Sequence, residues 1–438
     1  MSTSAYAPQM SAAEHRRMLT RAAIAATIGT TIEWYDFFLY GTATGLVFAS
    51  LYFPNSDRLV GTLNAFGIYA VGFVARPVGA YIFGHYGDRI GRKSTLIATL
   101  LLMGVATVLV GVVPTYQTIG IWGAIILTAL RFIQGVGVGG EWGGSVLMSM
   151  EWAGSHASRG LAASWPQMGV PAGLFTANLA VLAFSAWSGD AFLTWGWRIP
   201  FLLSVVLIAV GLWIRLGIEE SPTFKRLEAE NRIEKTPAST VIRHFPKEII
   251  LSALARMGEQ APFYIFTAFV FSYGVGQLKL SRDLLLTAVM TASVLSLFTV
   301  PFAGHLSDRF GRRRIYMLGA VLTGIYGFIY VGLLNTTAPL LVFIAIFVSL
   351  VPHDVMYGPQ AALIAECFPG RLRYSGASIG YQLASVIAGG PAPLIVAYLL
   401  AEYRSGWVIA WFILACCIIS LIATGLLPDN TNKPIPED

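Results

Sequence analysis

One ten-residue stretch occurs twice in this sequence. The copies are Gly84-His85-Tyr86-Gly87-Asp88-Arg89-Ile90-Gly91-Arg92-Lys93 and Gly304-His305-Leu306-Ser307-Asp308-Arg309-Phe310-Gly311-Arg312-Arg313. The glycines permit a tight turn and close backbone approach. The two aspartates offer acceptors to arginines or to the N-terminus of a neighbouring helix. Because the copies lie 220 residues apart, they predict two halves built on one plan.

The composition indicates a membrane protein. Fifty-five per cent of the 438 residues are hydrophobic and only 12 per cent are charged, whereas a soluble domain carries about 25 per cent. The formal net charge is +6, but Lys and Arg lie in short loops between apolar runs. This pattern predicts the lipid bilayer as a partner and argues against nucleic acid.

The apolar runs predict an all-α membrane protein with twelve transmembrane helices in two six-helix halves. A helix needs about 20 apolar residues to cross the hydrocarbon core. The predicted spans are 22–50, 61–83, 94–113, 119–150, 160–187, 197–217, 248–273, 283–303, 315–334, 338–365, 375–401 and 406–427.

These spans divide the chain into five parts. They are an N-terminal tail (1–21), a first half (22–217), a central loop (218–247), a second half (248–427) and a C-terminal tail (428–438). Most of the 29 Lys and Arg residues fall on loops of one side. By the positive-inside rule that side is cytoplasmic, so both termini of this multi-pass cell-membrane protein are expected there.

The repeated stretch follows the second span of each half, and it is predicted to form a gate on the cytoplasmic side. The gate residues are Gly84, Asp88, Arg89, Gly91, Arg92, Gly304, Asp308, Arg309, Gly311 and Arg312. The simpler alternative is that the basic residues only anchor these loops at the membrane surface.

The paired stretches resemble the signature of the major facilitator superfamily. Further motifs resemble its metabolite–proton symporter family: Glu33-Trp34-Tyr35-Asp36-Phe37, Arg131-Phe132-Ile133-Gln134-Gly135, Trp195-Gly196-Trp197-Arg198-Ile199-Pro200-Phe201 and Arg373-Tyr374-Ser375-Gly376-Ala377-Ser378. His353-Asp354 and the stretch from Ala255 to Phe271 are closest to shikimate carriers. The resemblance implies a major facilitator fold and a monomeric secondary active transporter working by alternating access. It also implies proton-coupled uptake of a small organic anion, such as shikimate or a di- or keto acid.

Eight Asp, Glu and Arg residues lie away from the ends of the predicted spans, where each costs about 2.5–3.5 kcal/mol at a helix centre and is a functional hypothesis by default. They are Glu33, Asp36, Arg76, Arg131, Glu141, Arg256, Glu259 and Asp354. Arg76, which precedes Pro77, is interpreted as structural, with a counter-charge for an anionic substrate as the alternative.

The first and fourth spans supply the predicted proton-coupling residues. Glu33, Asp36 and Tyr40 share one helix face by spacing, as do Arg131 and Gln134. The resemblance suggests that Asp36 pairs with Arg131, with Asp36 carrying the proton, Glu33 assisting and Arg131 also contacting substrate. A purely structural ion pair is the alternative.

Candidates in the other spans are ranked second. Arg256 is a counter-charge for an anion, unless it only neutralises Glu259 three residues away. His353 can relay a proton or simply pack, and Tyr357 shares its helix face. The remaining predicted substrate contacts are Tyr40, Gln134, Gln167, Tyr381 and Gln382.

Other function classes have less support. The match of Gly135-x-Gly137-x-x-Gly140 to a dinucleotide fingerprint lies in a continuous apolar run without the strand–turn–helix context. No cofactor, metal site or enzyme activity is predicted. The alternatives are a proline–betaine osmolyte symporter, an efflux antiporter and a membrane sensor that binds ligand without moving it.

Overall fold

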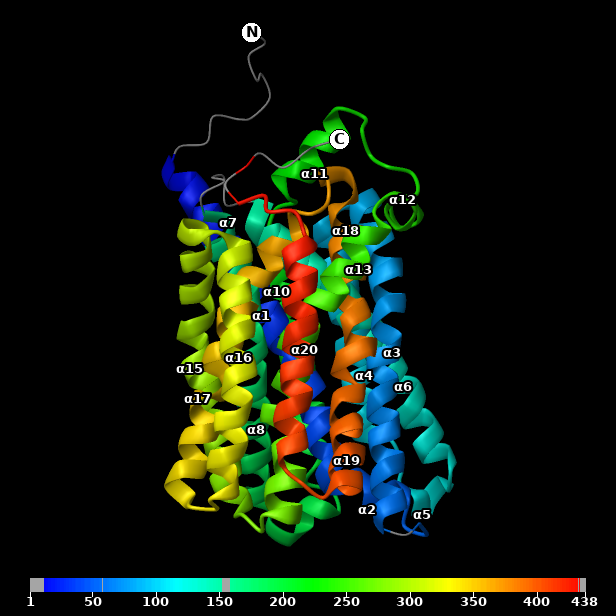
Figure 1. The fold of residues 1–438 in the computed structure, drawn as a ribbon. Helices are drawn as coiled ribbons and strands as arrows, with labels where there is room; N and C mark the ends of the chain where they lie inside the picture. The colour runs from blue at the N-terminus through cyan, green and yellow to red at the C-terminus, as the bar shows by residue number, and fades with distance from the viewer. Residues whose placement is uncertain (1–11, 57, 152–157, 432, 434–438) are drawn as a thin grey trace.

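The predicted all-α architecture is confirmed. The computed structural model describes residues 12–56, 58–151, 158–431 and 433. Within these ranges the chain is almost entirely helical and contains no strand. The helices run along one common direction as a bundle (Figure 1).

The first half supplies six traverses of the bundle, three of them built from joined segments. Its elements are α1 (Ala12–Ala43), η1 (Thr44–Phe48), α2 (Ala49–Tyr52), α3 (Arg58–Ile90), α4 (Arg92–Val112), α5 (Tyr116–Ile119), α6 (Trp122–Glu151), α7 (Arg159–Gln167), α8 (Gly169–Ser188), η3 (Gly189–Leu193), α9 (Arg198–Leu202) and α10 (Ser204–Leu216). The first traverse joins α1, η1 and α2, the fifth joins α7 and α8, and the sixth joins α9 and α10.

Two short helices connect the halves, and six further traverses follow. The elements are α11 (Pro222–Ala229), α12 (Pro237–His244), α13 (Pro246–Ala255), α14 (Met257–Tyr264), η4 (Ile265–Phe269), η5 (Ser272–Gln277), α15 (Arg282–Phe310), α16 (Arg312–Asn335), α17 (Pro339–Ala365), η6 (Gly370–Leu372), α18 (Arg373–Ala384), η7 (Ser385–Gly389), α19 (Pro391–Tyr403) and α20 (Trp407–Leu426).

Ten of these traverses are long and apolar enough to cross a membrane by length and composition, counted over the described ranges. The other two traverses are the first, which carries Glu33 and Asp36, and the seventh, which is divided into α13, α14, η4 and η5. Both depart from an ordinary apolar helix because they carry buried polar groups.

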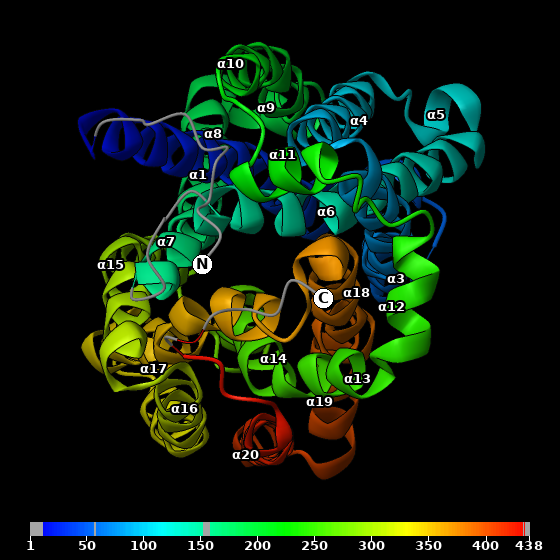
Figure 2. The same ribbon diagram turned by 90° about the horizontal axis from the view of Figure 1, so that it is seen from above.

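The two halves pack side by side (Figure 2). In the first half α6 packs against α3 and α4, and α1 against α8. In the second half α17 packs against α15 and α16, and α16 against α20. Between the halves, α3 meets α18, and α7 and α8 meet α15. The end of the bundle at which α11 and α12 lie is called the α11–α12 end below (Figure 1).

Glycines allow α3 and α6 to approach closely. A Cβ placed on Gly135 would lie 2.2 Å from the carbonyl oxygen of Gly72, and one on Gly139 would lie 2.0 Å from that of Arg76. Glycines four residues apart therefore bring the two backbones together, as expected for membrane helices. This packing fixes the position of Arg76 relative to Arg131 on α6.

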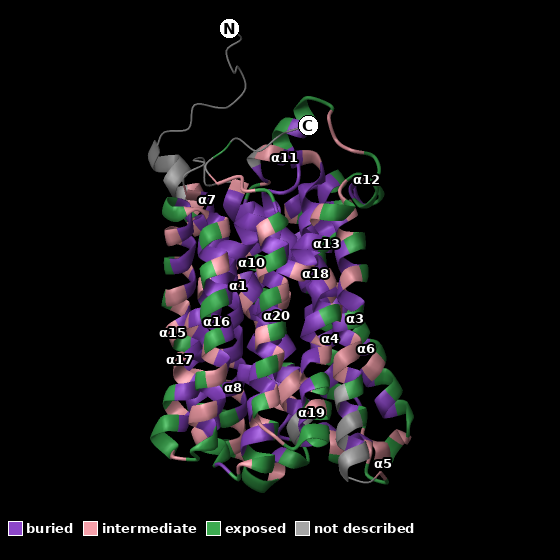
Figure 3. Cartoon of the chain, in the orientation of Figure 1, coloured by how far each residue is buried: buried purple, intermediate pink, exposed green. Residues whose placement is uncertain are grey.

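Burial follows the membrane pattern (Figure 3). Buried residues fill the centre of the bundle, whereas large apolar side chains are exposed on its outer faces, among them Val105, Trp213, Phe298, Ile325 and Trp411. Exposed apolar surface of this extent indicates contact with lipid.

The structure differs from the sequence-based expectations at three places. α1 already begins at Ala12, inside the predicted N-terminal tail, while residues 1–11 and 434–438 of the two tails lie outside the described residues. The predicted central loop contains α11 and α12. In each copy of the repeated stretch the helix ends directly before a glycine. Gly91 (φ 108°) and Gly311 (φ 100°) adopt a backbone conformation that other residues avoid.

Candidate functional site

Asp88 joins the two halves at the α11–α12 end. Its carboxylate accepts hydrogen bonds from the backbone N–H of Ser375 at 2.9 Å and of Tyr374 at 3.4 Å. These are first-turn groups of α18, which belongs to the other half. Asp88 therefore caps a helix N-terminus across the interface, where backbone N–H groups lack helical partners. Arg92 holds the same carboxylate at 3.3 Å.

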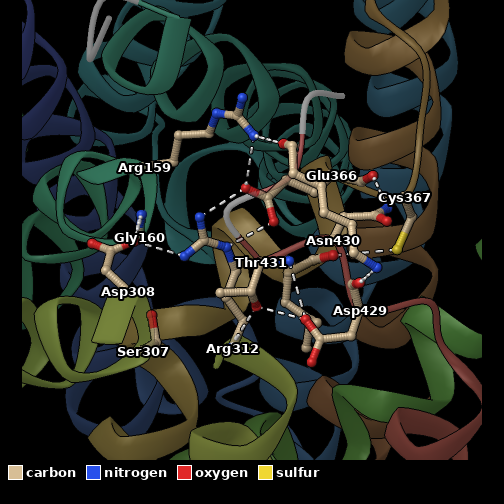
Figure 4. A network of polar contacts seen from close by, with 12 residues as sticks. Arg159, Gly160, Ser307, Asp308, Arg312, Glu366, Cys367, Asp429, Asn430 and Thr431 are labelled. Atoms are coloured by element: carbon tan, nitrogen blue, oxygen red, sulfur yellow. Dashed lines mark hydrogen bonds and ion pairs between the residues drawn. The ribbon is translucent and has the colours of Figure 1, made fainter. Parts of the chain in front are cut away.

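Asp308 makes the corresponding contact in the opposite direction (Figure 4). Its carboxylate accepts from the backbone N–H groups of Gly160 and Leu161, both at 2.8 Å. These groups belong to the first turn of α7. Arg312 donates to Asp308 at 2.7 Å and binds both oxygens of Glu366 at 2.7 and 2.8 Å.

The second copy is also held by the chain near its C-terminus (Figure 4). The Asn430 amide donates to the Glu366 carbonyl at 2.8 Å, and the backbone N–H of Arg312 donates to the Thr431 hydroxyl at 3.0 Å. In the first copy the acid in the place of Glu366 is Glu151. It lies 3.9 Å from Arg92 and 3.5 Å from Arg373, without hydrogen-bond geometry.

Close backbone contact at this end depends on two predicted gate glycines. A Cβ on Gly84 would lie 2.9 Å from the Cα of Ser375, and one on Gly304 would lie 2.7 Å from the Ser164 side chain. The predicted gate residues Arg89 and Arg309 are instead exposed and, among the described contacts, bind nothing in the opposite half. The structure therefore brings six of the ten predicted gate residues to the contact, whereas Gly91 and Gly311 end the helices beside it.

At the centre of the first half, Arg131 is buried among aromatic rings. Its guanidinium carbon lies 4.3 Å from the ring centroid of Phe37 and 4.6 Å from those of Tyr40 and Tyr69. Nη1 donates to Gln134 at 3.2 Å, while Nη2 has no hydrogen-bond partner. The predicted residues Tyr40, Arg131 and Gln134 thus lie together.

No described carboxylate lies within 4.0 Å of Arg131. Cation–π contacts of this kind contribute about 0.5–2 kcal/mol each. Burying an unpaired ion costs several kcal/mol even after relaxation. The aromatic rings offset this cost without neutralising the charge, so the site still favours an anion.

Asp36 does not contact Arg131 in this structure. One of its oxygens accepts from the Ser204 hydroxyl of α10 at 2.7 Å, and the other has no hydrogen-bond partner. The ion pair that the resemblance implied is therefore not formed. The residues are connected indirectly, because Gln134 donates to Thr107 at 2.8 Å and Thr107 lies beside Asp36.

Glu33 lies in a separate buried cluster that the sequence did not predict. Nη2 of Arg215 lies 3.3 Å from Glu33 and 2.9 Å from Glu141. Two carboxylates thus share one guanidinium, and the Thr30 hydroxyl also donates to Glu141 at 3.3 Å. Arg215 lies two residues before the end of the predicted span 197–217 and was not among the intramembrane candidates. The available signal was that Glu33 and Glu141, two intramembrane acids of this half, had no predicted cationic partner.

At the centre of the second half the buried charges contact one another. Arg256 lies 3.2 Å from Glu259, which also accepts from Gln360 at 2.9 Å. His353 lies between Glu259 at 3.3 Å and Asp354 at 2.9 Å, and its ring stacks on Tyr357 with centroids 5.3 Å apart. The predicted candidates of this half are therefore brought together as one network.

Four of the predicted substrate contacts lie where the halves meet. Trp142 stacks on Tyr381 with centroids 3.6 Å apart and donates to Gln167 at 2.8 Å. Gln167 donates to the Tyr357 carbonyl, and Gln382 donates to the Val138 carbonyl, both at 3.3 Å. Since Val138 lies seven residues beyond Arg131 on α6, this contact layer is about 10 Å nearer the α11–α12 end.

Comparison with known proteins agrees with this geometry. The family model described as Sugar (and other) transporter matches residues 22–247, and the Major Facilitator Superfamily model matches residues 249–437. The chain is 40% identical over 418 residues to the shikimate transporter of Escherichia coli, with 94% of each chain covered. The chain belongs to the major facilitator superfamily. It is therefore a membrane transporter of small molecules and not an enzyme.

Other relatives of this major facilitator have different names. It is 38% identical to the inner membrane metabolite transport protein YhjE of Escherichia coli, over 94% of each chain. It is 29% identical to the proline/betaine transporter of the same organism, covering 95% of this chain and 85% of the relative. The proton:xylose symporter XylE, solved with 6-bromo-6-deoxy-D-glucose, shares the fold with a TM-score of 0.76 at 16% identity, covering 97% of this chain and 98% of XylE.

Proposed function

We propose that this protein is a proton-coupled symporter that takes up a small organic anion by alternating access. The observation that carries the proposal is the buried guanidinium of Arg131, which has no carboxylate partner among the described residues. A carboxylate matches a guanidinium through two parallel hydrogen bonds. The likeness to a shikimate transporter supports the same substrate class.

Asp36 is the proposed proton carrier. It is buried, one of its oxygens has no hydrogen-bond partner, and no described cation lies within 4.0 Å. A carboxylate in such a place is neutralised by a proton at the lowest cost. With Asp36 neutral, the centre of the first half carries an excess of positive charge, so protonation favours anion binding. The structural likeness to a proton symporter concerns the fold alone.

The contacts at the α11–α12 end are the proposed gate of alternating access. Asp88 and Asp308 each cap a helix of the opposite half, so both contacts must break when the halves rock apart there. We place this end in the cytoplasm, with both termini, because most Lys and Arg residues outside the membrane lie there. The protein then resides in the cytoplasmic membrane and acts as a monomer.

Uptake into proteoliposomes with an imposed inward proton gradient tests the proposal. Labelled shikimate, 2-oxoglutarate, citrate, benzoate and betaine are offered separately. We expect accumulation of at least one of the four acids, and its loss when a protonophore collapses the gradient. Accumulation of betaine alone, or acid uptake that ignores the gradient, would reject the proposal.

A further inference from the structure

Arg76 lies beside Arg131 in the same aromatic surroundings. It comes from the middle of α3, and its guanidinium carbon lies 4.4 Å from the Phe37 centroid, the ring that Arg131 approaches to 4.3 Å. Phe73 lies 4.5 Å and Trp34 5.3 Å from Arg76. The backbones of α3 and α6 are held together by the glycine contacts described above. The two cations are therefore fixed neighbours.

Both guanidinium groups lack a counter-charge. Arg76 is 1% and Arg131 0% exposed, and no described carboxylate lies within 4.0 Å of either. Nε and Nη2 of Arg76 and Nη2 of Arg131 have no hydrogen-bond partner. Within the described part of the chain, three buried donors therefore lack a hydrogen-bond acceptor, and two positive charges lack a negative one. A bound anion would supply both.

Arg76 also reaches the second half, whereas the contacts of Arg131 are within the first. Nη1 of Arg76 lies 3.4 Å from the Ser385 hydroxyl of η7, and Gln260 of α14 donates to the same hydroxyl at 3.0 Å. An acid group bound at Arg76 would therefore sit where the halves meet. One bound at Arg131 would sit within the first half and near Asp36.

We propose that Arg76 and Arg131 form one two-cation site and that the substrate is a small organic dianion, with one carboxylate at each guanidinium. The inference rests on the proposed function and specifies the charge of its substrate. A single carboxylate would leave one buried guanidinium unpaired. Asp36 does not remove that excess, since it reaches Arg131 only through Gln134 and Thr107 and is protonated in the substrate-bound state of the proposed cycle.

Three diacids, each paired with its monoamide, measure the charge preference at nearly constant size. We titrate three pairs into the purified full-length protein: succinate and succinamate, glutarate and glutaramate, and phthalate and phthalamate. Affinity is obtained from the rise in unfolding temperature, because a ligand that binds the folded state stabilises it. We expect at least one diacid to bind about tenfold to a hundredfold more tightly than its monoamide, as a charge-assisted bond predicts.

The variant Arg76→Gln should reduce that preference to about one by weakening only the diacid. Arg76→Lys keeps the charge and should keep most of the preference. Arg243→Gln, at an exposed arginine of α12, removes the same charge outside the site and should change nothing. If Arg76→Gln cannot be isolated folded, the wild-type preference alone decides.

Two results would overturn the two-cation site. One is that every diacid binds no more tightly than its monoamide, and the other is that Arg76→Gln weakens both members of a pair equally. Proton-driven uptake of a monocarboxylate, without any preference for diacids, would reject this inference and leave the proposed function standing. If no organic anion is bound or taken up, the proposed function itself fails.

Discussion

The buried arginines at the centres of the two halves differ in whether they have an acidic partner. In the first half Arg76 and Arg131 face aromatic rings and have no acid within 4.0 Å among the described residues. In the second half Arg256 is paired with Glu259 and bonded to Gln360. A buried cation with its own counter-ion is part of the scaffold, whereas one without it is available to a ligand. We therefore assign charge binding to the first half and neutral support to the second.

The largest effect is expected from removing Arg131. Arg131→Gln should lower the initial rate of anion uptake on the order of a hundredfold, because it deletes a charge-assisted contact made by a buried guanidinium. Arg131→Lys should retain part of the activity, since it keeps the charge without the bidentate fork. Uptake within about threefold of wild type for Arg131→Gln would show that the unpaired cation has no role in binding.

Removing both charges of the Arg256–Glu259 pair in the second half should have a smaller effect on uptake. The effects of the two single substitutions on stability should be non-additive. Glu259→Gln leaves Arg256 buried without its acid, and Arg256→Gln leaves Glu259 without its cation, which costs about 3–5 kcal/mol in such pairs. The double variant removes both charges, so its thermal unfolding temperature should exceed that of either single variant.

Uptake by the double variant should likewise stay nearer to wild type than uptake by Arg131→Gln. A double variant as inactive as Arg131→Gln would mean that Arg256 binds the anion, which would contradict the contrast between the halves.

The smallest effect concerns the two copies of the gate. Arg312 binds both oxygens of Glu366, whereas Glu151 lies at 3.5 Å and 3.9 Å from its arginines. Glu366 also accepts from Arg159 of the first half at 3.4 Å, so Glu366→Gln should open the α11–α12 end more often than Glu151→Gln. The buried thiol of Cys367, next to Glu366, reports this opening.

Maleimide labelling of Cys367 provides the measurement, in a background where Cys416 and Cys417 are serine. We expect labelling about fivefold faster in Glu366→Gln than in the parent protein, as the loss of about 1 kcal/mol predicts. Glu151→Gln should label at nearly the parent rate. Equal acceleration in both variants would show that the two copies of the gate are held equally tightly.

The helices and the contacts of the proposed gate could be predicted from the sequence because their signals are local. Long apolar runs define a membrane helix by length alone, and the repeated stretch carries its own spacing. The sequence left open whether Asp88 and Asp308 would pair with arginines or meet a helix N-terminus, and in the structure each of them does both. It could not show that Arg89 and Arg309 are exposed. Adjacent helical positions point to different sides, and the repeat does not tell which side faces the other half.

The pairing of buried charges could not be predicted, because it depends on which helices meet. Glu33 and Asp36 share a helix face, yet Glu33 contacts Arg215 and Asp36 contacts Ser204. Arg256 and Glu259 were the exception, since both partners lie on one traverse three residues apart. Arg76 was interpreted as structural from its place before Pro77, and nothing in its own segment revealed that it would lie beside Arg131.

The central claim is that Asp36 carries the proton that accompanies an anion bound at Arg131. The most direct test compares Asp36→Asn with wild type in proteoliposomes, measuring both uptake driven by a pH gradient and exchange of internal for external anion. The account predicts that Asp36→Asn retains exchange but no longer accumulates the anion when the gradient is imposed. Accumulation equal to that of wild type would contradict it, because the proton would then be carried elsewhere.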